Sequence, residues 1–470
     1  MALDPVLLAR LQFGFTITFH IIFPAFTIGL SAYIATVLVM WLATGREHYH
    51  RLARFWTKIF AVSFAMGVVS GIVLSYQFGT NWSRFSVVVG NVIAPLIGYE
   101  VLTAFFLEAT FLGIMLFGWR RVPPWLHVMS AICVAVGTCT SAFWILAANS
   151  WMQTPAGFEM RNGVAFPLHW LEIIFNPSFP YRFAHMVTAA YLTTSFVVLA
   201  VGARYLRAGR HLDEARTMLR MAVGFIAIVA PLQLIIGDQH GLNTLEHQPI
   251  KIAAMEAHWD GSEPGALVLF GWPDEKNETN RFEISIPHGA SLVLKHDPNA
   301  LFEGLKDVPP ADRPPVAPPF FAFRIMVGIG LVMIAAGLIG VLLWWRGKLF
   351  DTRWYLWPVS QAWWLGFVAV IAGWIVTETG RQPWIATGIL RTADATSPVT
   401  AVAVAVSLAL FVVVYGIVFT MGIYYINRLI ARGPEGHAAE APAHGLPSRP
   451  LSAVEEAGRE LFTASGRPLS

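Results

Sequence analysis

The sequence predicts an all-α integral membrane protein with nine transmembrane helices, from its composition and from one repeated pattern. Of the 470 residues, 56% are hydrophobic and only 13% are charged, whereas an average soluble chain carries roughly 25% charged residues. The mean hydropathy is +0.57. This composition leaves too little polar surface to cover a water-soluble globule, and it also excludes a disordered chain or a disulfide scaffold.

The pattern is a series of nine apolar stretches, each long enough to cross a bilayer as a helix, which takes about 20 residues. They cover residues 14–42, 56–78, 94–118, 125–148, 183–205, 218–238, 320–345, 356–378 and 400–427. We therefore expect helices 1–6 within residues 1–238 and helices 7–9 within residues 320–432. Residues 239–319 are expected to form a long connecting loop, and residues 433–470 a polar tail.

The Lys and Arg residues beside these stretches predict the orientation of the chain. They cluster in the turns after every odd-numbered stretch, as Arg46, Arg120 and Arg346 illustrate, and are sparse in the opposite turns. Because basic residues favour the cytoplasmic side, we expect a periplasmic N-terminus, a periplasmic 239–319 loop and a cytoplasmic C-terminus. The net charge of only +3, with no run rich in Lys or Arg, gives no reason to expect nucleic acid as a partner.

Local patterns predict some structure between and after the stretches. Residues 249–259 favour a short helix that begins at Pro249 and turns an apolar face inward. Alternation over residues 281–286 indicates a strand. The proline-rich run 308–320 indicates stiff polyproline that leads into the seventh helix, and residues 452–462 favour a short amphipathic helix in the tail.

Ionisable or soft side chains interrupt the apolar stretches, where a charged group costs about 2.5–3.5 kcal/mol to insert. They are His20, Glu100, Glu108, His185, Arg324, Met326 and Glu378. Counted from the expected outer ends of their helices, five of them lie at similar depths: His20, Glu100, His185, Met326 and Glu378. Five possible iron ligands from five helices at one depth predict a cofactor site in the outer leaflet.

Haem iron fits this set best, because His and Met are common axial ligands and a carboxylate suits a high-spin iron. Copper is disfavoured, since no stretch carries two histidines at the spacing of a copper site. Arg324 is placed to pair with a haem propionate, and Glu108, about 12 Å along the helix from Glu100, suggests a proton path from the inner face. The ordinary alternatives are a histidine in a helix–helix hydrogen bond and a methionine in packing.

Several motifs resemble subunit I of the cytochrome bd-type quinol oxidases, over roughly residues 5–430. They are Arg10-Leu11-Gln12-Phe13 before His20, Gln77–Trp82, Glu100 with Phe105–Glu108, Ser141–Trp144, Asn149 with Trp151–Gln153, His185, Lys251 with Glu256, Phe323–Met326 and Glu378–Trp384. The strings Gly380–Trp384 and Phe323–Met326, at their proper distance from one another, are the most specific part of the resemblance.

The resemblance implies three haems: a low-spin b haem, a high-spin b haem and an oxygen-reducing haem, which is haem d or a third haem b. His185 and Met326 would ligate the low-spin haem. The other two haems would be served by His20, Glu100 and Glu378, with His20 assigned to the oxygen-reducing haem and Glu378 to the high-spin b haem. Arg324 and Arg381 would lie beside the haems.

The resemblance also implies a route for quinol and for protons. Lys251 and Glu256 would contact the quinol, although they are about 140° apart round a helix and need not share a face. Glu108, with Ser141 and Glu100, would carry protons from the inside. The segment between the sixth and seventh helices is short for the family, as in the branch that includes cyanide-insensitive oxidases.

The implied enzyme is a terminal quinol:oxygen oxidoreductase of the bacterial cytoplasmic membrane. It would oxidise quinol at the periplasmic side and reduce O2 to water with cytoplasmic protons, generating a proton motive force without pumping. The expected partners are subunit II, small single-helix subunits and the lipid bilayer.

Three alternatives remain on the residues alone. A haem protein could relay electrons from quinone to another acceptor, but that class typically carries paired histidines on two helices, and the stretches hold too few. A proton-coupled transporter could use Glu100 and Glu108 and would need broken helices at the midplane. A non-catalytic scaffold would leave the buried carboxylates unexplained.

Overall fold

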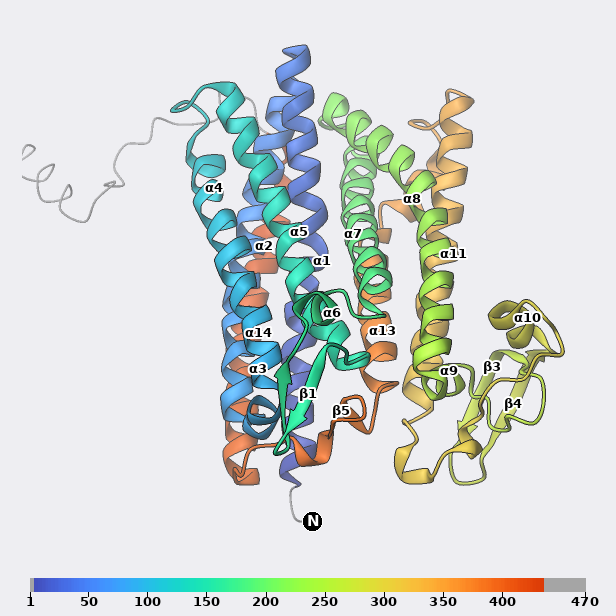
Figure 1. Cartoon of the computed structure of the whole chain (residues 1–470). Coiled ribbons are helices and arrows are strands. Elements are labelled where there is room, and N and C mark those ends of the chain that lie inside the picture. Colours follow the sequence, from blue (N-terminus) through green and yellow to red (C-terminus); the bar gives the residue numbers. More distant parts are fainter. Residues whose placement is uncertain (1–3, 435–470) are drawn as a thin grey trace, which may run out of the picture.

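The computed structural model describes residues 4–434 and is a bundle of long helices (Figure 1). Within that range, nine helical segments are long and apolar enough to cross a membrane, which confirms the expected all-α membrane class. The helix expected at residues 452–462 lies outside the described residues.

The spanning segments are α1 (Pro5–Thr44), α2 (Glu47–Thr80), α3 (Ser83–Glu100) continued by the π-helical turn η1 (Val101–Phe105) and α4 (Phe106–Phe117), α5 (Pro124–Gln153), α7 (Phe179–Arg207), α8 (Leu212–His247), α11 (Ala317–Trp345), α13 (Leu365–Thr379) and α14 (Ala401–Arg432). Most of them extend beyond the apolar stretch that predicted them. The start of α1 shows why: the Asp4 side chain accepts a hydrogen bond from the Val6 N–H at 2.9 Å, and Pro5 occupies the first helical position, where no donor is needed.

The eighth stretch is not one helix over 356–378, so that expectation is wrong at its start. A separate helix, α12 (Arg353–Val359), precedes a turn at Ser360, and η4 (Ala362–Trp364) then leads into α13. Pro358 removes a backbone donor from the last turn of α12. The side chains of Arg204 and Arg207 on α7 then fix the turn, because they donate to the Ser360 carbonyl at 3.0 Å and to its hydroxyl at 2.7 Å.

The spanning helices pack against one another as one connected bundle. α1 lies against α2, α5 and α7, while α7 lies against α8 and α13, and α11 lies against both α8 and α13. The largest apolar core joins these elements and includes the fully buried Trp56, Phe60 and Phe196. Because lipid is as apolar as these side chains, their burial stabilises the bundle through close packing and not through removal from water.

The short elements gather at the end of the bundle where the N-terminus lies, which we call the N-terminal face (Figure 1). They are β1 (Phe158–Arg161), β2 (Val164–Pro167), α6 (Trp170–Ile174), α9 (Pro249–Glu256), β3 (Leu267–Asp274), β4 (Thr279–Ile286), α10 (Gly289–Lys295), η2 (Leu305–Asp307), η3 (Pro310–Asp312), β5 (Trp384–Ala386), β6 (Leu390–Arg391) and η5 (Thr392–Asp394). The opposite end is the basic face, whose turns carry Arg46, Arg120, Arg210 and Arg346.

The connecting loop confirms two local predictions and corrects two. A short helix does begin at Pro249, and residues 281–286 do form a strand, paired antiparallel with β3. The short helix ends at Glu256, because Ala257 adopts a left-handed conformation, so Trp259 is buried beyond the helix rather than on its face. The polyproline expected over 308–320 is wrong at its end, where α11 already begins at Ala317 and places two prolines in its first turn.

Close contact between α8 and α11 depends on Gly337. A Cβ atom built there would lie 2.9 Å from the Ala227 backbone nitrogen, whereas one at Gly328 on the same helix would meet nothing within 4 Å. We expect Gly337→Leu to separate the two helices and to cost about 1–3 kcal/mol, the usual range for overpacking, while Gly328→Leu leaves stability unchanged. Thermal unfolding of both variants in detergent tests this, and equal midpoints would contradict it.

Candidate functional site

His185 and Met326 each face a glycine on a neighbouring helix. A Cβ atom at Gly237 on α8 would lie 3.2 Å from the His185 ring, and one at Gly373 on α13 would lie 3.1 Å from the Met326 sulfur. The Nδ1 atom of His185 is buried and has no hydrogen-bond partner among residues 4–434. His185 offers an imidazole with an unpaired nitrogen, and Met326 offers a thioether. The helices that carry them, α7 and α11, both contact α8 and α13. These two side chains are of the types that serve as axial ligands of a low-spin haem.

His20 is oriented from the second helix. Its Nδ1 atom lies 3.0 Å from the Ser70 hydroxyl on α2, and a Cβ at the adjacent Gly71 would lie 3.2 Å from its ring. Ser70 is itself held by the carbonyl of Met66 at 2.9 Å. A hydrogen bond to one ring nitrogen is how proteins orient a histidine whose other nitrogen binds a metal.

Glu100, Ser141 and Glu108 line the contact of the third span with α5. The Ser141 hydroxyl donates to Glu100 Oε1 at 2.8 Å, rather than to Glu108, with which the resemblance associated it. The Glu108 side chain is buried and packs against Gly137, one turn before Ser141. Its Oε1 atom finds no hydrogen-bond partner in the described part of the chain. The π-helical turn η1 separates the two glutamates, and such turns are frequent at functional sites.

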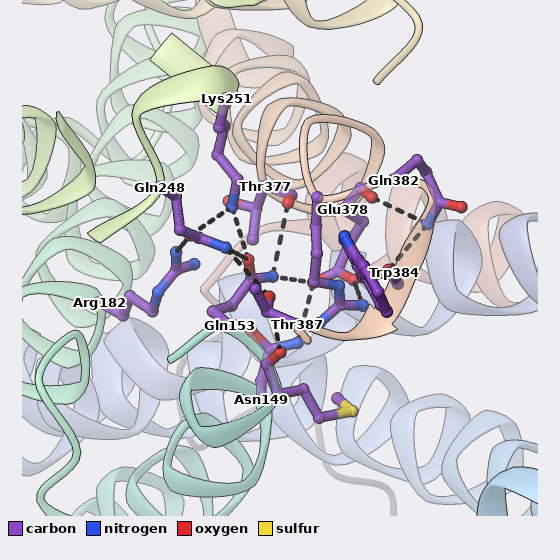
Figure 2. A network of polar contacts seen from close by, with 12 residues as sticks. Asn149, Gln153, Arg182, Gln248, Lys251, Thr377, Glu378, Gln382, Trp384 and Thr387 are labelled. Carbon is purple, nitrogen blue, oxygen red and sulfur yellow. Dashed lines mark hydrogen bonds and ion pairs between the residues drawn. The ribbon is translucent and has the colours of Figure 1, made fainter. Parts of the chain in front are cut away.

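Glu378, at the end of α13, is the centre of a polar network (Figure 2). Its Oε1 atom accepts hydrogen bonds from Asn149 at 2.9 Å and from Gln153 at 3.3 Å, both on α5. Its Oε2 atom forms an ion pair with Arg381, three residues later. Both carboxylate oxygens therefore have partners, and the donors hold the charged form of Glu378 inside the protein.

Lys251 joins this network from α9. Its ammonium donates to Gln153 Oε1 at 2.5 Å and to Gln248 Oε1 at 2.8 Å, and Arg182 on α7 reaches the same Gln248 oxygen at 3.4 Å. Figure 2 shows these side chains converging from three elements. Burial, together with the nearby Arg182 and Arg381 guanidiniums, places the pKa of Lys251 well below its ordinary value.

Glu256 points to a different partner, Arg324 on α11. The guanidinium Nη2 lies 3.2 Å from Glu256 Oε2, while its other nitrogens donate to the carbonyls of Met255 and Val268, each at 2.7 Å. Arg324 therefore pairs with Glu256 and with loop backbone. Lys251 and Glu256 lie on different sides of α9, as their spacing round a helix predicts. Burial raises the pKa of Glu256, and Arg324 opposes that rise.

Glu100 and Glu378 lie at two levels instead of the single depth expected for the candidate ligands. Ser141 and Asn149, which bind Glu100 and Glu378, are eight residues apart on α5, which is about 12 Å. Glu378 is the nearer of the two to the N-terminal face. The expected depth of Glu100 was wrong because α3 already begins at Ser83, eleven residues before the apolar stretch.

Sequence reasoning missed the residues that surround Glu378. Neither Arg182 nor Gln248 stands in a motif or a pattern that points to this site. Asn149 and Gln153 stood inside a family motif, but nothing in the motif indicated that their amides would bind Glu378. Their four-residue spacing, which places both on one face of α5, is the one pattern that points to a shared partner.

The fold defines a multi-pass membrane protein, and the His, Met and Glu side chains described above are of the types that ligate haem iron. Residues 8–434 match the family model for subunit I of the cytochrome bd terminal oxidases. The chain is 36% identical to cytochrome bd ubiquinol oxidase subunit 1 of Bacillus subtilis (strain 168), covering 92% of this chain and 95% of that protein. It is 32% identical to cytochrome bd-II ubiquinol oxidase subunit 1 of Escherichia coli (strain K12), covering 93% and 99%.

The solved structure of bd oxidase from Geobacillus thermodenitrificans is also similar, with a TM-score of 0.84 and 32% identity over 92% of this chain and 99% of that chain. The chain therefore belongs to the family of cytochrome bd terminal oxidase subunit I. It is an oxidoreductase subunit of the quinol oxidase class and a multi-pass protein of the bacterial inner membrane. The family implies haem cofactors and a complex of several subunits.

The raised pKa of Glu256 predicts how stability depends on pH. A carboxyl group that keeps its proton longer in the folded chain stabilises the fold fully below the ordinary glutamate pKa, and that contribution is lost as pH rises through the raised value. We therefore expect wild type to lose stability relative to Glu256→Gln as pH increases from about 4.5. Thermal midpoints across pH measure this. The exposed Glu303 supplies the control Glu303→Gln, and parallel curves for wild type and Glu256→Gln would refute the prediction.

Proposed function

We propose that this chain is the haem-bearing subunit that oxidises quinol at the N-terminal face and reduces O2 to water with protons taken from the basic face. The basic face would be cytoplasmic, so the N-terminus and the 239–319 loop would be periplasmic and the C-terminus cytoplasmic. Because quinol oxidation and proton uptake would occur at opposite faces, the reaction would separate charge without pumping protons. Subunit II and small single-helix subunits would complete the enzyme.

The observation that carries the proposal is that each expected iron ligand is positioned by a neighbouring helix. His185 and Met326 face glycines, His20 is held by Ser70, and Glu378 is held by two amides and an arginine. When bound, haem supplies iron that takes up electrons singly and binds oxygen, while the protein supplies ligands and electrostatics.

We assign His185 and Met326 to a low-spin b haem. His20, Glu100 and Glu378 are assigned to a high-spin b haem and an oxygen-reducing haem, which is haem d or a third haem b. Within this set, His20 would serve the oxygen-reducing haem and Glu378 the high-spin b haem. Because both Glu378 oxygens already have partners, ligation of iron by Glu378 would require one of these partners to be released.

Quinol would bind beside α9. Glu256 would accept a proton from the quinol hydroxyl, and Arg324 would stabilise the carboxylate before the transfer, because the two side chains form an ion pair. Lys251 is buried on the other side of α9, so its contact with quinol would require the lysine to leave Gln153 and Gln248. Arg324 is engaged by four hydrogen bonds, which favours positioning of Glu256 over binding of a propionate.

Protons would reach the oxygen site along the third span. Glu108 is the buried carboxyl group nearer the basic face, and Glu100, which accepts a hydrogen bond from Ser141, lies eight residues nearer the N-terminal face and is itself assigned to the haems. The unpaired Oε1 atom of Glu108 gives it the capacity to receive a proton from one side and pass it to the other.

The decisive measurement is a reduced-minus-oxidised absorption spectrum of the purified complex. We expect b-type bands in wild type, loss of the low-spin band in His185→Ala, and no change in His169→Ala, which alters an exposed histidine at the N-terminal face. Oxygen consumption with a short-chain quinol should accompany the bands. A folded, colourless complex would exclude the proposal, and bands without oxygen consumption would favour an electron relay instead.

The proton route predicts a separate effect on turnover. Glu108→Gln should retain the haem bands but slow quinol-driven oxygen consumption by about a hundredfold or more, the range typical of a lost proton-transfer group. Glu108→Asp should recover part of the rate. Glu172→Gln, at an exposed glutamate of the N-terminal face, is the control. Full activity in Glu108→Gln would remove Glu108 from the route.

A further inference from the structure

The hairpin of β3 and β4, together with the helix α10 that follows it, presents apolar side chains to the outside of the molecule. Phe270, Ile284 and Ile286 on the hairpin are 52%, 61% and 49% exposed, and Leu292 and Val293 on α10 are exposed as well. We call these five residues the hairpin patch. A loop surrounded by water would turn such residues inward, and a group of exposed apolar side chains marks a contact with a protein or with a membrane.

The strand register explains why the three hairpin residues share one face. Phe270 pairs with Ile284, and Ile286 lies two residues further along β4, so their side chains project from the same side of the hairpin. The register shifts between Val268 and Phe270, where Leu269 is an extra residue. This bulge lets Phe270 face away from the side of Val268, which is buried.

The opposite face of the hairpin is fixed to the bundle. The Val268 carbonyl accepts a hydrogen bond from Arg324 of α11 at 2.7 Å. On α10, Ala290 is buried in an apolar cluster that also contains Leu245 of α8 and Ala322 of α11. The inner side of the hairpin and of α10 is therefore occupied, and the hairpin patch lies on the side that faces away from the helices.

The hairpin patch adjoins the lipid-facing surface of the bundle. Figure 1 shows α10 and the hairpin alongside the lower part of α11, to one side of the bundle. The neighbouring helices α8 and α11 also expose apolar side chains, such as Ile235 and Ile325. These surfaces face lipid, because the chain is a multi-pass membrane protein. Since α10 packs against α8 and β3 packs against α11, the hairpin patch continues a surface that lipid covers.

Polarity changes along the hairpin in the order that a lipid leaflet requires. The turn 274–279 consists of polar residues only, and Glu275 accepts a hydrogen bond at 2.8 Å from the N–H of Val316, which directly precedes α11. Trp272 is exposed, and its ring lies 5.4 Å from that of Phe321 near the start of α11. Tryptophan rings favour the level of the lipid headgroups. Figure 1 shows α10 nearer the middle of the bundle than the hairpin.

We propose that the hairpin patch is a membrane anchor that enters the lipid leaflet at the N-terminal face. The exposed sides of the hairpin and of α10 contact acyl chains, Trp272 lies at the headgroups, and the turn 274–279 remains in water. Interfacial elements bury their apolar face by about 5–10 Å. The anchor holds β3 at a fixed depth beside Arg324, which binds the Val268 carbonyl. This inference depends on the membrane location of the chain and not on the proposed reaction.

The test measures how accessible a nitroxide label is in the complete complex, reconstituted in nanodiscs of phosphatidylethanolamine and phosphatidylglycerol. The label is attached through Ile284→Cys or, as the matched control, through Lys276→Cys on the exposed turn. Both variants also carry Cys133→Ala and Cys139→Ala, and the complex without an introduced cysteine supplies the background signal. At Ile284 we expect collisions with oxygen, which partitions into lipid, to exceed collisions with a water-soluble nickel chelate severalfold. At Lys276 we expect the reverse order.

Two results of this measurement would overturn the proposal. Frequent collisions with the nickel chelate at Ile284 would show that the hairpin patch faces water. Rare collisions with both reagents would show that a protein surface covers it. Elution volume in size-exclusion chromatography checks that each variant is assembled, and Phe270→Cys, on the paired strand, supplies the same measurement if Ile284→Cys fails to assemble.

A second measurement identifies what contacts the hairpin patch. The photoreactive amino acid p-benzoylphenylalanine replaces Phe270, the complex is irradiated in the same nanodiscs, and the chain is analysed by mass spectrometry. We expect an increase in mass that matches a phospholipid adduct. Crosslinking to another protein chain, or the absence of any adduct, would reject the membrane anchor.

Discussion

A carboxylate among apolar helices is stable only where donors surround it, and the arrangement of this protein around Glu378 follows from that constraint. The donors come from α5, from the segment after α13 and, through Gln153, from α9. No one of these segments could satisfy the charge alone. The network therefore fixes the end of α13 against α5 and the connecting loop, and these contacts hold Glu378 at one position relative to the helix that carries His185.

The two sides of α9 divide the polar chemistry of the connecting loop. One side presents Lys251 to the amides beside Glu378, and the other presents Glu256 to Arg324. An eight-residue helix thus lies between a group suited to accept a proton from a substrate and a network suited to hold an iron ligand. Because the helix is short and its core positions are fully buried, displacement of one side would also displace the other.

The sequence was sufficient to predict the number of spans and the residues that interrupt them, because hydropathy and insertion cost act on the chain locally. It did not predict where helices end. α8 continues to His247 through polar residues that hydropathy assigned to a loop, and the break at Ser360 depends on arginines from α7. The family motifs implied that Ser141 acts with Glu108, whereas its hydroxyl donates to Glu100. The amides around Glu378 were not expected, since a contact between residues more than 200 positions apart leaves no local pattern.

The π-helical turn between Glu100 and Glu108 sets the angle between these two side chains. In an uninterrupted α-helix, residues eight positions apart differ by about 80° in direction, whereas seven positions differ by only about 20°. A π turn accommodates one additional residue without the rotation that an α-helix would give it. The turn therefore aligns both glutamates toward α5, and conversion of residues 101–105 to regular α-helix without loss of a residue would rotate Glu108 by about 100° away from that direction.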